Sequence, residues 1–345
     1  MGLCVADRDH EQRRAREFEM IEAEVERSLL GGEFKYTREQ AAEIAGVPLE
    51  RAQRLWVALG FAHDDKPDEP MFTDADVDAL KSITSLVDAG IIDPALEVSV
   101  TRALGQAFSR LAEWQLGLLN TYVADRVRNH EAGDEVDPRA VAAAASLVAE
   151  QMLPTLEKLQ SYAWRRHLAS NAARFLDRRS EDTDRRTLVI GFADMVGYTS
   201  LTRRLDITEL TTLLEFFEST VTTVISQNRG WVIKNVGDEV LFAAEDPVDA
   251  ARIALSLQDA AQTTEELPNL RVGLALGEVL VRFGDVYGAV VNIAARLTSS
   301  ARPGTVLIDS AMADALESEH EFQVRSMRTL RVRGYSRLKA YTLRR

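Results

Sequence analysis

Cysteine is almost absent from this sequence, which has one such residue, Cys4, in 345 positions. A single cysteine excludes an internal disulfide framework and a cysteine-rich zinc site. Long apolar runs are absent too, because no segment reaches the roughly 18 apolar residues that a membrane-spanning helix needs. Residues 1–19 are charged throughout and lack the apolar centre of a signal peptide. These absences predict a cytoplasmic protein with no integral membrane segment.

Basic residues are also fewer than acidic ones. The chain has 41 Lys and Arg against 54 Asp and Glu, which gives a formal net charge of −13. The overall field of such a protein repels phosphates, so we expect no general binding to nucleic acid or to an anionic membrane.

The first half of the chain has the apolar spacing of helices. Thr37 and Thr73 begin helix-capping patterns, Gly46 is a suitable helix end, and Pro48 opens another short helix. Two longer helical runs follow, at residues 95–129 and 138–177. Gly105 and Gly117 are expected to break the first run, and Pro154 interrupts the second. We predict an all-helical domain over residues 1–160 and a linker helix over residues 161–186, which ends in a dense charge run.

The second half, residues 187–345, changes periodicity. Short apolar runs typical of strands occur at 187–193, 230–235 and 239–243. Two further strands are predicted at 271–275 and 278–283, on either side of Leu276-Gly277. Helical patterns lie between these runs. The resulting β-α-β-β-α-β order predicts a ferredoxin-like α+β fold.

Two aspartates in this half are candidate ligands for metal ions. Asp194 follows a buried strand directly, and Asp238 lies in a turn between two predicted strands. Each alone would be read as a capping or turn residue. Together, carboxylates from neighbouring strands are suited to hold hard cations such as Mg²⁺ beside substrate phosphates. Farther along, Asn292 and Arg296 share one face of a predicted helix whose other positions are small or apolar.

Residues 187–345 resemble the catalytic domain of class III nucleotide cyclases. The resemblance implies that Asp194 and Asp238 bind two Mg²⁺ or Mn²⁺ ions and that Lys234 and Asp285 recognise the base. It also implies that Asn292 orients the ribose and that Arg296 stabilises the transition state. Family members form ATP or GTP sites between two catalytic domains, so one chain with both residue sets implies a homodimer. Arg333 lies near a family phosphate contact, although a solvated basic hairpin fits it equally well.

The base-recognising pair favours ATP. Lys234 has only donors and ionised Asp285 only acceptors, which matches the N1 acceptor and N6 donor of adenine. Guanine reverses both groups and would meet mismatched partners. The alternatives are a guanylate cyclase or a catalytically silent cyclase-like signalling protein.

The helical half admits two interpretations. Residues 36–80 suggest a helix-turn-helix DNA-binding module, but residues 29–90 carry six basic against twelve acidic residues, the wrong charge for DNA. The whole chain resembles bacterial class III cyclases whose all-helical N-terminal domain regulates or inhibits catalysis, and some of these respond to pH. Residues 161–184 are then a candidate switch. His167 within them is a candidate pH sensor, or an incidental residue of a plain linker helix.

Overall fold

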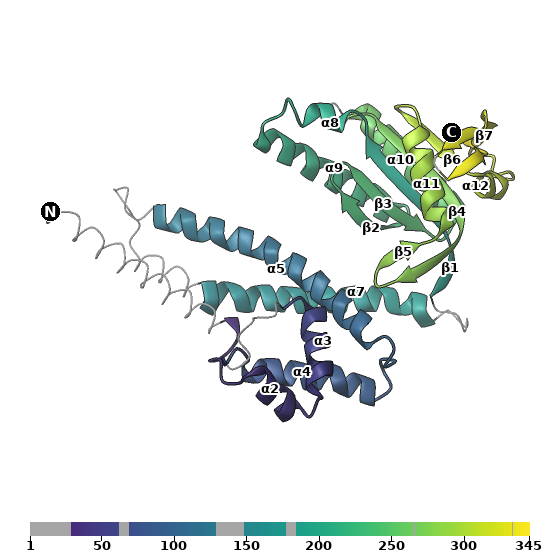
Figure 1. Cartoon of the computed structure of the whole chain (residues 1–345). Helices are drawn as coiled ribbons and strands as arrows, with labels where there is room; N and C mark the ends of the chain where they lie inside the picture. Colours follow the sequence, from purple (N-terminus) through teal and green to yellow (C-terminus); the bar gives the residue numbers. More distant parts are fainter. Residues whose placement is uncertain (1–28, 62–68, 129–147, 177–183, 265, 333) are drawn as a thin grey trace. The chain divides into compact units, whose positions relative to one another are not determined.

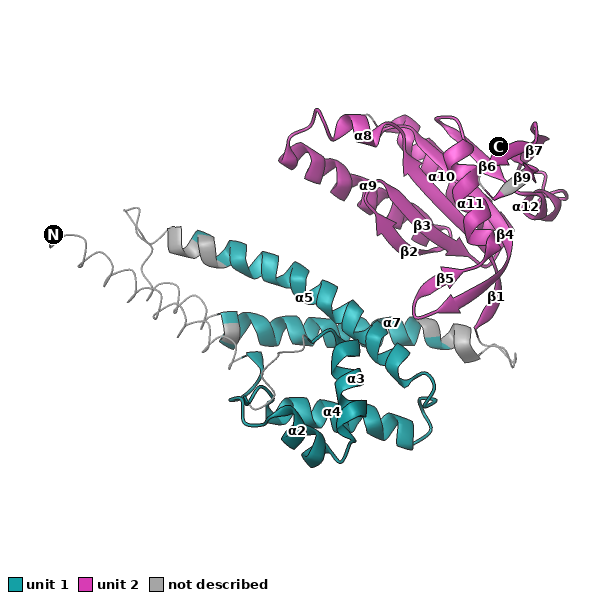
Figure 2. Ribbon diagram, in the orientation of Figure 1, with its two compact units in different colours: residues 1–178 teal, residues 179–345 magenta. Residues whose placement is uncertain are grey.

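The computed structural model describes residues 29–61, 69–128, 148–176, 184–264, 266–332 and 334–345 (Figure 1). The chain divides into two compact units, residues 1–178 and 179–345 (Figure 2). Among the helices of the described residues, none has the length and apolar character needed to cross a membrane.

Unit 1, as far as it is described, is helical. Its elements are α2 (Arg38–Ala45), α3 (Leu49–Leu59), α4 (Asp74–Asp88), α5 (Glu97–Arg128), the π-helical turn η1 (Val148–Met152) and α7 (Leu153–Leu176). Thr37 and Thr73 both form capping boxes, and Gly46 ends α2 in the left-handed conformation, as the sequence predicts. Leu55, Trp56 and Leu80 centre a small core.

The breaks predicted within the long helical runs have different outcomes, and the one predicted at Gly117 is wrong because α5 continues through it. The second run is divided next to Pro154: the π-helical turn η1 ends at Met152, and the α-helix α7 begins at Leu153. Gly105, in contrast, lies inside the uninterrupted α5. A Cβ at this position would come within 2.4 Å of the Leu59 carbonyl oxygen. Gly105 therefore permits close packing of α5 on α3.

Unit 2 is built around an eight-stranded sheet. Its elements are β1 (Arg185–Met195), α8 (Tyr198–Leu201), α9 (Ile207–Gln227), β2 (Trp231–Val236), β3 (Glu239–Ala244), α10 (Pro247–Thr263), β4 (Leu270–Arg282), β5 (Asp285–Tyr287), α11 (Ala289–Ser300), β6 (Thr305–Ile308), α12 (Ser310–Ala315), β7 (Gln323–Ser326), β8 (Leu330–Val332), β9 (Tyr335–Leu338) and β10 (Tyr341–Arg344). The predicted α+β class and its β-α-β-β-α-β order are confirmed.

The sheet separates two apolar layers. Its strand order is β2-β3-β1-β4-β6-β10-β7, with β5 paired to the far end of β4, and β8 and β9 form a separate hairpin. Side chains alternate along β1: Val189 and Ala193 pack with α9 and α10, whereas Leu188 and Ile190 pack on the face covered by α11. The α11 face carries the predicted site.

One predicted element is wrong. The sequence predicts two strands on either side of Leu276-Gly277, but β4 runs unbroken from Leu270 to Arg282. Gly277 makes no turn, because its backbone stays extended within the strand. A Cβ there would come within 2.8 Å of Val290 in α11. This glycine therefore serves the packing of helix on sheet.

Candidate active site

The first part of the site is a row of charged side chains across three strands. In the sheet register, Asp194 of β1 lies opposite Glu239 of β3 on one side and Arg271 of β4 on the other. Directly opposed residues of antiparallel strands project from the same face. The row is acid, acid, base, and it extends the α11 face of the sheet beyond the apolar residues of β1.

Asp238 joins this row from the turn between β2 and β3. Gly237 and Asp238 form a two-residue connection, in which Gly237 has a φ of 61°. The backbone N–H of Met195 donates to the Asp238 carbonyl oxygen over 3.0 Å and ties the turn to the end of β1. The pKa of Asp194 is raised by burial and then by the charge of Asp238, while Arg271 opposes the shift. The structure thus brings the two predicted aspartates together.

Glu239 and Arg271 are absent from the sequence prediction. Burial, followed by the charges of Asp194 and Asp238, raises the pKa of Glu239 to about 7. Arg271 has a buried Nε atom with no hydrogen-bond partner. Only the pairing of β1 with both neighbours reveals these positions, since Arg271 is 77 positions from Asp194 along the chain.

The donor set fits a divalent cation bound together with phosphates. Within the described ranges, no group of three or more His, Cys, Asp or Glu side chains is arranged to hold a metal. Mg²⁺ is commonly held by only one or two carboxylates, with phosphates and water completing its shell. Asp194 and Asp238 supply those carboxylates, and Arg271, opposite Asp194 in the strand register, supplies a positive charge beside them for an anion.

The second predicted pair is also brought together. The Lys234 Nζ atom of β2 lies 2.6 Å from the Asp285 Oδ2 atom of β5. Burial raises the pKa of Asp285, but the hydrogen bond from Lys234, the Val286 amide and the charge of Lys234 hold it below its usual range. The Lys234 side chain is 47% exposed and that of Asp285 30%, so the pair remains accessible to a ligand.

Asn292 and Arg296 lie one turn apart on α11. Val290, Ala294 and Leu297 bury the opposite side of this helix. Neither polar side chain forms a hydrogen bond or ion pair with any described residue, Asp194 and Asp238 included.

Two further predicted positions contribute nothing to this geometry. Arg333 lies outside the described residues. His167 is exposed on α7 of unit 1.

Comparison with known proteins identifies both halves of the chain. Residues 181–345 match the model of the adenylate and guanylate cyclase catalytic domain, and residues 10–160 match that of the adenylate cyclase regulatory domain. An adenylate cyclase of Streptomyces coelicolor is 42% identical over 290 residues, 84% of this chain and 73% of that protein. One of Glutamicibacter nicotianae is 37% identical over 93% of this chain and 81% of its own length. A pH-sensitive adenylate cyclase of Mycobacterium tuberculosis is 29% identical over 84% and 72%.

The chain therefore belongs to the class III adenylate cyclase family and is an enzyme of that class. The catalytic match covers the sheet and all six predicted site positions, and the regulatory match covers most of unit 1.

Proposed function

We propose that this enzyme converts ATP into 3′,5′-cyclic AMP and pyrophosphate in the cytoplasm, at a site shared by two copies of the chain. The observation that carries the proposal is the convergence of Asp194, Asp238 and Arg271 at one end of β1. Such a group is suited to bind a nucleoside triphosphate with divalent cations.

The reaction requires the ribose 3′-oxygen to attack the α-phosphorus while pyrophosphate leaves on the opposite side. Asp194 and Asp238 would hold two Mg²⁺ or Mn²⁺ ions, which when bound neutralise phosphate charge and lower the pKa of the attacking hydroxyl. Arg271, opposite Asp194 in the strand register, would contribute the positive charge of its guanidinium to a bound phosphate.

The residues on α11 supply the remaining functions. Arg296 presents a planar guanidinium without an ion-pair partner among the described residues, suited to the charge that builds up on phosphoryl oxygens. Asn292, one turn earlier, would hydrogen-bond the ribose and orient its 3′-oxygen.

Lys234 and Asp285 would select the base. Their 2.6 Å contact places a donor and an acceptor side by side. Adenine offers the complementary acceptor at N1 and donor at N6, whereas guanine offers the reverse. Selection of ATP over GTP follows from this arrangement.

A homodimer would complete the site. Asp194 and Asp238 would come from one copy, while Lys234, Asp285, Asn292 and Arg296 would come from the other. Large apolar side chains lie exposed near the base-recognising pair, including Val236 at 57%, Phe283 at 49% and Tyr287 at 52%. Association of two copies gives these side chains a surface to cover them.

The test incubates the purified chain with ATP or GTP and either Mg²⁺ or Mn²⁺, and measures cyclic nucleotide. We expect cyclic AMP from ATP, little product from GTP, and loss of at least about a thousandfold in Asp194→Asn. Asp314→Asn, an exposed aspartate on α12, is the matched control and should retain activity. Absence of product from the full chain and from a chain beginning near Arg185 would contradict the proposal.

Regulation is proposed for the N-terminal part of the chain. Residues 1–160 would act as the regulatory domain, residues 161–186 as the connecting switch, and residues 187–345 as the catalytic domain. If the N-terminal domain inhibits, a chain beginning near Arg185 will show a higher specific activity than the full chain. Equal specific activities at all conditions tried would contradict autoinhibition.

The proposed signal is pH, with His167 as the candidate sensor. Histidine changes charge near neutral pH, His167 is exposed on α7, and one relative is a pH-sensitive adenylate cyclase. His167→Ala is therefore expected to flatten the activity profile between about pH 5.5 and about pH 8. An unchanged profile would reject the sensor role and leave α7 as a plain linker helix.

A further inference from the structure

A two-residue turn joins β4 to β5 next to the base-recognising pair (Figure 1). Phe283 and Gly284 form this turn, with φ angles of 52° and 81°. Arg282 and Asp285, the residues on either side of the turn, lie opposite each other in the strand register. Two successive positive φ angles are characteristic of a type I′ turn, for which Asn-Gly is the preferred sequence.

Phe283 is an unusual residue for such a turn. Among the described residues other than glycine, positive φ angles occur only at Arg229 and Phe283. This backbone conformation is unfavourable for a bulky side chain, whereas glycine and asparagine adopt it more readily. Burial does not compensate for the strain, because the Phe283 side chain is 49% exposed. Strained residues are concentrated at functional sites, so we expect the ring of Phe283 to have a binding role.

The ring of Phe283 lies on the side of the hairpin that carries the base-recognising pair. Arg282 and Asp285 project from the same face, because they are directly opposed in antiparallel strands. The Arg282 Cζ atom lies 4.9 Å from the centre of the Phe283 ring, over the ring. The Asp285 Oδ2 atom on this face contacts the Lys234 Nζ atom. Val286, on the opposite face, is 4% exposed and packs in the core under α11.

A ring in this position can stack on the base that Lys234 and Asp285 recognise. The guanidinium of Arg282 covers one face of the ring in a cation–π contact and so restrains its orientation. Aromatic side chains stack on any nucleobase, because every base has a π face. Stacking therefore increases the affinity for adenine and guanine alike, whereas the hydrogen bonds of Lys234 and Asp285 distinguish the two bases.

We propose that Phe283 stacks on the adenine of ATP and that the strained turn between β4 and β5 holds its ring in place for this contact. The proposal rests on the proposed function, in which Lys234 and Asp285 bind the base. It adds a residue that determines affinity to a pair that determines specificity. In a site shared by two copies of the chain, the bound base then covers part of the exposed Phe283 side chain.

The main test measures binding without turnover. Calorimetry titrates the full chain in Mg²⁺ with 3′-deoxy-ATP, which lacks the attacking hydroxyl, and separately with inorganic tripolyphosphate. Phe283→Ala should bind 3′-deoxy-ATP about tenfold more weakly than wild type does. Its affinity for tripolyphosphate should be unchanged, because only the base is stacked. Phe283→Trp should restore the affinity for 3′-deoxy-ATP.

Phe283→Asn separates the ring from the turn. Asparagine tolerates a positive φ, so this variant should be at least as stable as wild type in urea unfolding. It should nevertheless bind 3′-deoxy-ATP as weakly as Phe283→Ala does. A less stable Phe283→Asn would contradict the strain in the turn, and wild-type affinity in this variant would contradict the stacking.

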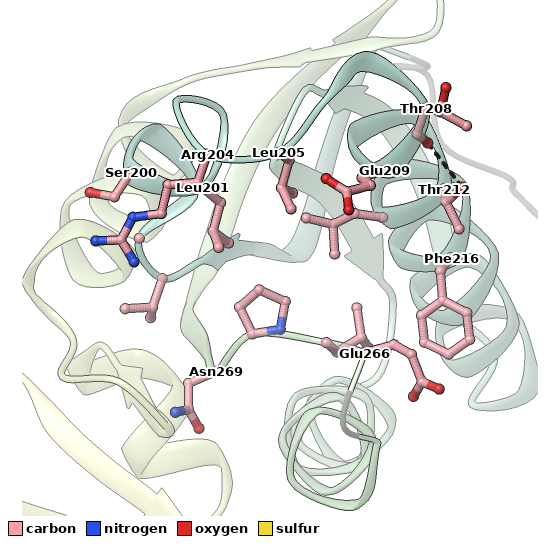
Figure 3. A pocket seen from close by; sticks show the side chains of 15 residues that line it. Ser200, Leu201, Arg204, Leu205, Thr208, Glu209, Thr212, Phe216, Glu266 and Asn269 are labelled. Atoms are coloured by element: carbon pink, nitrogen blue, oxygen red, sulfur yellow. Dashed lines mark hydrogen bonds between the residues drawn. The ribbon is translucent and has the colours of Figure 1, made fainter.

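Phe216→Ala is the matched control. Phe216 is a phenylalanine of comparable exposure, 37%, in the wall of an open cavity between α8, α9 and the segment leading into β4 (Figure 3). Neither Lys234 nor Asp285 lines this cavity. The affinity of Phe216→Ala for 3′-deoxy-ATP should therefore equal that of wild type.

The kinetic constants provide a second readout. In Phe283→Ala the KM for ATP and the KM for GTP should rise by the same factor, so that the ratio of the two kcat/KM values stays at the wild-type value. A changed ratio would show that Phe283 selects the base and would contradict the proposal.

Three binding results would overturn the stacking role. The first is wild-type affinity of Phe283→Ala for 3′-deoxy-ATP. The second is an equal loss of affinity for 3′-deoxy-ATP and tripolyphosphate, which is a general effect on the site. The third is weaker association of two copies in sedimentation with normal binding by the dimer, which would assign Phe283 to the second copy. Failure of the proposed base site is distinguishable, because wild type itself would then bind 3′-deoxy-ATP no better than tripolyphosphate.

Discussion

Lys234 and Asp285 illustrate how much of this site is decided by single side chains. Each satisfies the other over 2.6 Å, and an incoming base has to offer both an acceptor and a donor to replace that contact. A base with the opposite pattern leaves both groups without a partner in a partly buried position. The binding free energy lost in this way is far larger than the free energy that a weak contact contributes.

Replacement of Lys234 by glutamine should therefore weaken selection of ATP. Glutamine can donate but carries no charge, and it also accepts. We expect kcat/KM for ATP to fall about 10- to 100-fold and the ratio of ATP to GTP turnover to shrink. Lys339→Gln, an exposed lysine of unit 2, should change neither quantity. A Lys234→Gln enzyme with the wild-type ratio would exclude the base-selecting role.

The sequence predicts some residues of the site and not others. Asp194 and Asp238 are 44 positions apart and Lys234 and Asp285 are 51 apart, yet the structure brings each pair together. These four residues can be predicted because the sequence around them resembles that of class III cyclases. Glu239 and Arg271 were missed because their place beside Asp194 follows from strand register, which no local pattern encodes. The catalytic roles themselves remain predictions.

Among the elements, α12 depends on one buried acid. Asp309 is 8% exposed and caps this helix by accepting from the Met312 N–H over 2.9 Å. Burial raises its pKa above the ordinary value of 3.8, although its backbone hydrogen bonds oppose the shift. In the folded state Asp309 therefore holds its proton to higher pH than in the unfolded state.

Two substitutions separate the cap from the charge. Because the folded pKa is raised, the contribution of Asp309 to stability falls as pH rises from 3.8 through the folded value. Asp309→Asn keeps an accepting oxygen without charge, so its stability relative to wild type should improve as pH rises from about 4 to about 7. Asp309→Ala loses the cap and should cost about 1 kcal/mol at neutral pH. Urea unfolding measures both, and equal destabilisation by Asn and Ala would refute this account.

Helix α5 provides a matched pair of glycines. A Cβ at Gly105 meets the Leu59 carbonyl oxygen at 2.4 Å, whereas one at Gly117 meets no atom within 4 Å. Gly105→Ala should cost about 1–3 kcal/mol of unfolding free energy because α3 and α5 must separate. Gly117→Ala should stabilise by up to about 1 kcal/mol. Unfolding followed by circular dichroism compares the two, and equal effects would exclude the packing role of Gly105.

Elements are more predictable than their contacts. The capping boxes at Thr37 and Thr73 and the change of helix at Pro154 follow from local chemistry, and all are confirmed. At Gly105 and Gly277, in contrast, the sequence predicts a break, but α5 and β4 run on without one. Each glycine is needed because another element passes close to it, and that neighbour is distant in the sequence.

At the scale of the whole molecule, the charge of −13 opposes a polyanionic substrate. Binding of ATP must then depend on local groups, the two proposed cations together with Lys234, Arg271 and Arg296. Among the described residues, no hydrogen bond or ion pair joins the carboxylate cluster to the α11 pair. The account requires two copies of the chain to bring both sets to one substrate.

Co-expression of two inactive variants tests this requirement most directly. Asp194→Asn removes a carboxylate from one half of the site, and Arg296→Gln removes the guanidinium from the other. If the site is shared, random pairing yields mixed dimers in half of the population, each with one intact site, and about a quarter of wild-type cyclic AMP formation returns. If mixed dimers form and are no more active than either variant alone, each chain builds its own site and the account is wrong.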